Sequence, residues 1–137
     1  MAARTKARKR ALDVLFEADQ RGANVIAVLE DRLKDSGRET SLPPYSETLV
    51  RGVVDHWIDI NAQLAGASEE WTVDRMPAVD RAILRLGAYE VLFSTDVPEP
   101  VAISEWVGLA TELSTDDSPR FVNGLLARLA EVKPTLA

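Results

Sequence analysis

The amino-acid sequence predicts an all-helical protein with six or seven helices that share one core. Apolar residues recur at helical spacing from end to end, no stretch alternates β-branched with polar residues, and glycine or proline interrupts the pattern repeatedly. No linker is long enough to separate two domains, and no repeat of roughly 20–50 residues is evident. The 137 residues are therefore expected to form one domain.

The first two predicted helices end at recognisable signals. Residues 5–21 place apolar side chains on one face and stop at Gly22, a residue that readily adopts the left-handed conformation found at helix ends. A shorter amphipathic helix is expected between Asn24, a suitable N-cap, and Gly37. Residues 36–44 are polar and end in two prolines, so we expect a surface loop there.

The central segments continue the helical pattern. One apolar stripe covers about residues 45–65 and predicts a single long helix closed by Gly66. Residues 68–75 are expected to form at most a short helical turn. Pro77 then suits the first turn of the next helix, whose apolar stripe continues to Leu92.

Two further helices complete the prediction. Pro98 marks the turn before an apolar stripe over residues 103–113. Ser118 is expected to cap the last helix, with Pro119 in its first turn. Pro134 ends the pattern.

Enzyme signatures are scarce in this sequence. It has no cysteine and a single histidine, His56, so the usual ligands of zinc and the thiol nucleophile are missing. No glycine-rich nucleotide loop or serine nucleophile motif is present. The adjacent carboxylates Asp116 and Asp117 are interpreted as complements of a helix dipole. We therefore expect a non-catalytic cytoplasmic protein without a cofactor, metal or membrane segment.

The charge is distributed asymmetrically along the chain. The net charge is −6, yet the first ten residues carry no acid and five cations, which are Arg4, Lys6, Arg8, Lys9 and Arg10. A basic arm on an acidic body can hold phosphate at one place. Phe16 follows on the same predicted helix, and arginine-rich helices with available aromatic side chains are typical of RNA binding. A solvated tail, with Phe16 in the core, is the alternative.

A second candidate cluster lies near the other end of the chain. Residues 118–124 place Arg120 and Phe121 in the first turn of a predicted helix, where backbone N–H groups also point outward. Phe121 suits a core position as well as a stacking platform. Gly124 inside a helix costs ~1 kcal/mol relative to alanine, so we expect a close helix crossing or a close ligand there.

Three groups of residues in the sequence form a recognisable set. They are residues 7–11 with 15–16, residues 79–85 with 89–90, and residues 96–105 continuing to 117–124. Together they resemble the NusB family of transcription antitermination proteins over nearly the whole chain, and the last group is the most specific. The first group departs from the family's arginine cluster at Thr5 and Lys6.

This resemblance implies a fold of two three-helix bundles packed together, with subdomains at about residues 1–66 and 67–137. It also implies a function. NusB pairs with NusE, a protein of the small ribosomal subunit, and the pair binds the boxA element of nascent RNA. RNA polymerase in that complex then resists termination, notably on ribosomal RNA operons.

The resemblance also assigns the site residues. Those expected to face RNA are Lys6, Arg8, Arg10, Phe16, Asp117, Arg120 and Phe121. Those expected to face NusE are Asp74 and Asp80, because an acidic patch suits a basic ribosomal partner. Both carboxylates also suit the N-terminal dipole of the helix that follows them.

Two other functions stay open at this point. Some ribosomal RNA cytosine methyltransferases carry a NusB-like RNA-binding module, although this chain lacks the length for their S-adenosylmethionine-binding half. A structural helical protein whose basic arm has no specific partner is the other alternative. The sequence also leaves open a monomer or a homodimer that hides its RNA surface.

Overall fold

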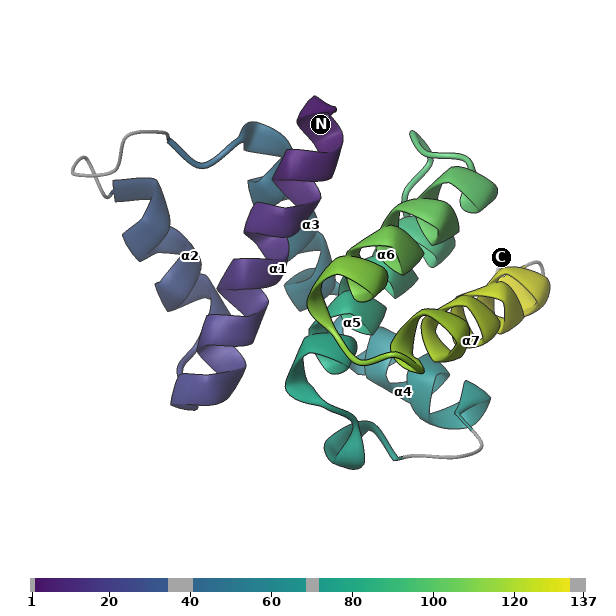
Figure 1. The fold of residues 1–137 in the computed structure, drawn as a ribbon. Helices are drawn as coiled ribbons and strands as arrows, with labels where there is room; N and C mark the ends of the chain where they lie inside the picture. The colour runs from purple at the N-terminus through teal and green to yellow at the C-terminus, as the bar shows by residue number, and fades with distance from the viewer. Residues whose placement is uncertain (1, 35–40, 69–71, 134–137) are drawn as a thin grey trace.

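The computed structural model describes residues 2–34, 41–68 and 72–133, and within these ranges it contains helices and no strand. This confirms the all-helical prediction. The helices are α1 (Ala3–Arg21), α2 (Val25–Lys34), α3 (Pro44–Asp55), α4 (Trp57–Ala67), α5 (Ala78–Leu92), α6 (Glu99–Leu113) and α7 (Ser118–Val132), with a short 3₁₀ turn η1 (Val73–Arg75) before α5 (Figure 1).

The helices pack as two groups around α5. Helices α1, α2 and α3 contact one another, while α4, α6 and α7 gather around α5. Helix α5 also packs against α1 and α3, and it thereby joins the two groups (Figure 1). The subdomain boundary near residue 66 stays a prediction. Helix α4 precedes that boundary in the chain, but it packs with the second group of helices.

The structure divides the predicted helix over residues 45–65 at His56, so the prediction of one continuous helix is wrong. The backbone of His56 lies at φ −111° and ψ 24°, outside regular helix geometry. Its imidazole stacks on Phe93, with ring centroids 3.9 Å apart. The bend lets α3 pack against α1 while α4 packs against α7. The apolar spacing continues across the break, so the sequence pattern alone does not reveal it.

Several predicted helix ends agree with the structure. Gly22 caps α1 at φ 62°, and the Asn24 side chain accepts a hydrogen bond from the Ala27 N–H at 3.1 Å. The predicted cap at Ser118 is wrong, because Asp117 precedes the helix and Ser118 is its first residue. The predicted stops at Gly37 and Pro134 lie outside the described residues.

Helices approach each other closely at Gly52 and Gly87, but not at Gly124. An added Cβ at Gly52 would lie 2.3 Å from the Tyr89 ring, and one at Gly87 would lie 2.8 Å from Leu126. At Gly124 an added Cβ would meet nothing within 4 Å among the described atoms. A helix crossing at Gly124 is therefore ruled out, and a close ligand there stays a prediction.

Candidate nucleic-acid interface

Three of the residues predicted to face RNA share the outer side of α1. Lys6 is exposed, Arg10 is partly exposed, and Phe16 is 36% exposed. The apolar residues of α1 occupy the opposite side, where Ala11 and Leu15 are buried. Amphipathic spacing thus separates a core face from a face that carries cations and an aromatic ring.

Arg8 differs from this group, because its side chain is only 2% exposed. Its Nε and Nη2 atoms donate to the two carboxylate oxygens of Glu90 at 2.8 and 2.9 Å, and Nη1 donates to Glu105 at 2.8 Å. Three of its five N–H groups donate to these carboxylates, and the burial of the side chain keeps a phosphate from reaching the remaining two. The prediction that Arg8 contacts RNA is therefore corrected: in this structure Arg8 is an internal ion-pair partner.

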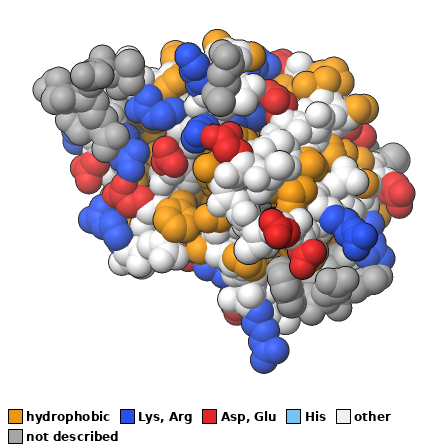
Figure 2. All heavy atoms as spheres, viewed as in Figure 1, with side chains coloured by type: hydrophobic (Ala, Val, Ile, Leu, Met, Phe, Trp, Pro, Cys, Tyr) orange, Lys and Arg blue, Asp and Glu red, His pale blue; other side chains and the backbone are white. Residues whose placement is uncertain are grey.

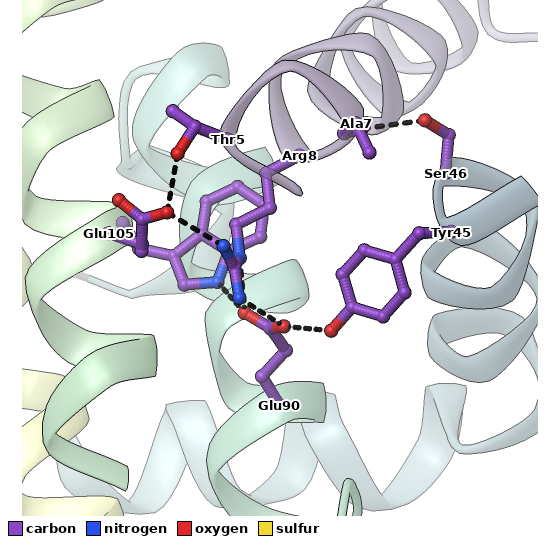
Figure 3. Close-up of polar contacts among 8 residues, drawn as sticks. Thr5, Ala7, Arg8, Tyr45, Ser46, Glu90 and Glu105 are labelled. Carbon is purple, nitrogen blue, oxygen red and sulfur yellow. Dashed lines mark hydrogen bonds and ion pairs between the residues drawn. The ribbon is translucent and has the colours of Figure 1, made fainter. Parts of the chain in front are cut away.

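The Glu90 carboxylate is the centre of a buried polar network, shown in Figure 3. Besides Arg8, it accepts hydrogen bonds from the Tyr45 hydroxyl and from Trp106 Nε1, the latter at 2.6 Å. Burial by itself lowers the pKa of Arg8, but the hydrogen bond and charge of Glu90, together with Tyr45 and the charge of Glu105, outweigh it and raise that pKa. Burial, followed by the Glu90 hydrogen bond, raises the pKa of Tyr45. Both donors therefore keep their protons at neutral pH.

The second predicted RNA cluster lies at the start of α7. Asp117 and Arg120 are exposed, whereas Phe121 is partly buried and packs against the core. The loop before α7 follows directly on the last turn of α6. There Glu112 pairs with Lys9 of α1 at 2.6 Å, so the start of α7 lies on the same side of the molecule as the outer face of α1 (Figure 1).

Asp80 is fully buried, which corrects the prediction that it faces a protein partner. Its carboxylate accepts hydrogen bonds from Ser114 Oγ at 2.5 Å and from Ser118 Oγ at 2.8 Å. The Thr115 N–H in turn donates to Ser118 Oγ at 3.3 Å. Asp80 therefore fixes the loop between α6 and α7, and with it the position of the predicted RNA cluster.

Asp74 is exposed in η1, as a partner-binding role requires. Its turn is held by Arg81, whose Nη1 donates to the carbonyl oxygens of Val73, Asp74 and Met76 at 3.1–3.2 Å. The Nε and Nη2 atoms of Arg81 donate to Asp19 at the end of α1, at 2.9 and 2.6 Å. One guanidinium thus connects α1, η1 and α5.

Acidic side chains interrupt the basic surface. The Glu112 hydrogen bond and charge raise the pKa of Lys9, and Glu17 on α1 pairs with Arg21 and Arg32. Figure 2 shows red and blue side chains interspersed over this face rather than one continuous basic field. Phosphate is therefore attracted to particular cations, and the surrounding carboxylates oppose contact elsewhere.

Sequence reasoning missed the buried network and the Arg81 connection. One signal was available, because Glu90 interrupts an otherwise apolar stretch from Leu86 to Phe93. A carboxylate at such a position requires a buried cation. The sequence does not show which cation, since Arg8 is 82 residues away.

The described residues contain no group of three or more side chains able to hold a metal ion. Within the same ranges, no helix is long and apolar enough to cross a membrane. The structure therefore defines an all-helical protein whose candidate site is a surface built from α1 and the start of α7.

The chain belongs to the NusB family, whose model matches residues 5–131. It is 57% identical to transcription antitermination protein NusB of Kineococcus radiotolerans, over 100% of this chain and 99% of that protein. The NusB protein of Streptomyces coelicolor is 53% identical, with 99% and 98% of the two chains covered.

Solved structures give the same assignment. NusB of T. maritima is similar with a TM-score of 0.82 and 30% identity, covering 95% of this chain and 92% of that one. A crystal structure of NusB and NusE in complex with double-stranded RNA matches with a TM-score of 0.80 and 25% identity, covering 94% and 96%.

Proposed function

We propose that this protein is a non-catalytic, RNA-binding transcription antitermination factor of the cytoplasm. With NusE it binds boxA RNA and joins the RNA polymerase complex that resists termination, notably on ribosomal RNA operons. The observation that carries the proposal is the outer face of α1, where Lys6, Arg10 and Phe16 are accessible together. The NusB–NusE–RNA structure and the antitermination relatives support it. They favour this function over the methyltransferase-module alternative.

The proposed RNA surface joins α1 to the start of α7. Lys6, Arg10 and Arg120 contact phosphates, and Phe16 and Phe121 offer faces on which unstacked bases can stack. Asp117 lies beside the backbone N–H groups of the first turn of α7, where its carboxylate can accept from a base or a ribose hydroxyl. Arg8 acts from inside the protein and contributes no direct contact.

Titration of RNA affinity against salt tests this surface. Log affinity should fall as log salt rises. Three phosphate contacts on a single strand predict a slope at least as steep as about −2, because each contact contributes ~0.7. Arg120→Ala should flatten the slope by about 0.7. Lys34→Ala is a matched control, because Lys34 is an exposed cation on α2, which packs against α1 and α3.

A boxA-like RNA compared with a scrambled RNA tests sequence recognition. Phe16→Ala should weaken boxA binding by ~1–3 kcal/mol without changing the salt slope, because stacking carries no net charge. Equal affinity for both RNAs would reduce the proposal to nonspecific binding. Equal affinity of Phe16→Ala and the parent would remove Phe16 from the interface.

The protein-partner surface is proposed at Asp74. Asp74→Lys should weaken binding of the basic partner NusE by about 1 kcal/mol, mainly through slower and less salt-sensitive association. Asp31→Lys, an equal charge change at an exposed position of α2, is the control. Unchanged association of Asp74→Lys would move the partner site elsewhere. The homodimer stays a prediction, which sedimentation with and without RNA tests.

A further inference from the structure

The first turn of α1 carries features that oppose helix formation. The residue before it, Ala2, makes no side-chain capping hydrogen bond. The first turn itself, all of which lies within the described residues, contains no acidic side chain. Arg4 and Lys6 instead place positive charge at the positive end of the helix dipole. Without a cap, such a turn is expected to fray. Contacts with the rest of the protein must therefore hold it.

Those contacts come from two other helices, α6 and α3. Thr5 Oγ1 donates to Glu105 of α6 at 2.6 Å, and the same carboxylate oxygen accepts from Arg8. The Arg4 guanidinium lies over the Tyr45 ring of α3, 4.2 Å from its centroid. Figure 3 shows Thr5, Arg8, Glu105 and Tyr45 of this set, with Thr5 and Arg8 both pointing toward the Glu105 carboxylate.

Glu90 of α5 organises this set of contacts. It is fully buried, and one of its oxygens accepts from both Arg8 and Trp106 while the other accepts from both Arg8 and Tyr45. The Glu90 carboxylate therefore fixes two side chains. One is Arg8, which anchors α1, and the other is Tyr45, whose ring lies against Arg4.

We propose that Glu90 and Tyr45 are positioning residues for RNA binding, which hold the first turn of α1 so that Arg4 and Lys6 face the RNA. The inference rests on the proposed RNA-binding function. It adds Arg4 to the phosphate contacts. Neither Glu90 nor the Tyr45 hydroxyl touches RNA in this arrangement.

This proposal makes a prediction opposite in sign to simple electrostatics. Removing a negative charge near an RNA surface should strengthen RNA binding when charge alone acts. Removing the charge of Glu90 should weaken it, because the first turn of α1 then loses its anchor. Glu112 is the matched control, since it is an exposed carboxylate that pairs with Lys9 on the same face.

The experiment measures the binding of full-length Glu90→Gln and Glu112→Gln to boxA-like RNA across a salt series. Glu90→Gln should lose roughly tenfold in affinity, within the range for residues that act through others. Its salt slope should flatten by up to about 1.4, the share of Arg4 and Lys6. Glu112→Gln should bind as well as the parent or more tightly. Affinity for NusE should not change, because Asp74 lies beyond the opposite end of α5.

A second readout reports on the turn itself. The Lys6 N–H donates to the Ala2 carbonyl at 3.1 Å, so its amide exchange should accelerate in Glu90→Gln while exchange in α5 stays slow. If Glu90→Gln fails to fold, Tyr45→Phe decides. Tyr45→Phe keeps the ring against Arg4 and removes only the hydroxyl. It should weaken RNA affinity and accelerate Lys6 amide exchange, each by a smaller factor than Glu90→Gln.

The outcomes separate this inference from the function on which it rests. No RNA binding by the parent protein would overturn the proposed function. Parent binding with unchanged or tighter binding by folded Glu90→Gln, at an unchanged salt slope, would overturn the inference alone. The same holds if Tyr45→Phe matches the parent in both affinity and exchange.

Discussion

The carboxylates of Asp74 and Asp80 lie six positions apart but have different surroundings. Asp80 is buried and accepts hydrogen bonds from Ser114 and Ser118, whereas Asp74 is exposed. A variant that replaced both by lysine would bury a charge at position 80 and confuse partner binding with unfolding. For this reason the partner test uses Asp74 alone.

Asp80→Ala should lower the free energy of unfolding by ~1–3 kcal/mol, because it leaves the buried Ser118 hydroxyl and the partly buried Ser114 hydroxyl without their acceptor. Asp74→Ala should stay within about 0.5 kcal/mol of the parent, as expected for an exposed residue. Urea unfolding followed by circular dichroism measures both. Equal stability of the two variants would show that the Asp80 contacts contribute nothing.

Glycines in helices offer a second residue-scale test. Gly124→Ala should raise stability by up to ~1 kcal/mol, because the helix propensity improves and the added Cβ meets open space. Gly52→Ala should destabilise the protein despite the same propensity gain, because the Tyr89 ring must move and overpacking costs ~1–3 kcal/mol. Melting temperatures measure the pair, and a stabilised Gly52→Ala would contradict the close approach.

At the scale of elements, Arg81 of α5 connects η1 to α1 and α5, two helices that also pack against each other. Its five donor contacts reach Asp19 at the end of α1 and three carbonyl oxygens of the segment around η1. A planar guanidinium satisfies these directions together, whereas an ammonium group does not.

Arg81→Lys should therefore lower the free energy of unfolding by ~1–2 kcal/mol and weaken NusE binding through a looser Asp74 turn. Arg51→Lys is the control, because Arg51 forms a surface pair with Glu47 one helical turn away. Chemical denaturation and partner titration measure the two effects. If Arg81→Lys is as stable as the parent but binds NusE more weakly, Arg81 holds the Asp74 turn without contributing to the stability of the fold.

At the scale of the whole molecule, the Glu90 network lies where the two groups of helices meet, since its members come from α1, α3, α5 and α6. Tyr45 gives this junction a pH dependence. Burial and then the Glu90 hydrogen bond raise its pKa in the folded protein above the ordinary value of about 10.

Stability should therefore decrease as the pH rises above about 10, because the unfolded chain releases the Tyr45 proton while the folded protein retains it. The slope contributed by one such group is at most about 1.4 kcal/mol per pH unit. Tyr45→Phe should make the decrease shallower, as urea midpoints between pH 9 and 11 would show. An unchanged alkaline slope would mean that other groups control it.

Much of the architecture could be predicted from local patterns. The helical periods, the Gly22 cap and the Asn24 cap depend on near neighbours in the chain, and the structure agrees with them. The exposed cations of α1 also follow from the amphipathic pattern. The break at His56 could not be predicted, because the apolar spacing is the same on both sides of it.

The sequence by itself determined the helical class, the family and the face of α1 that reaches solvent, since each depends on residue types at short spacing. Only the tertiary structure decided that Arg8 and Asp80 are internal. Their partners Glu90, Ser114 and Ser118 lie 34 to 82 residues away, so their burial depends on how the helices meet. A charged side chain can be buried only where packing brings a partner within hydrogen-bond distance, and no local pattern contains that information.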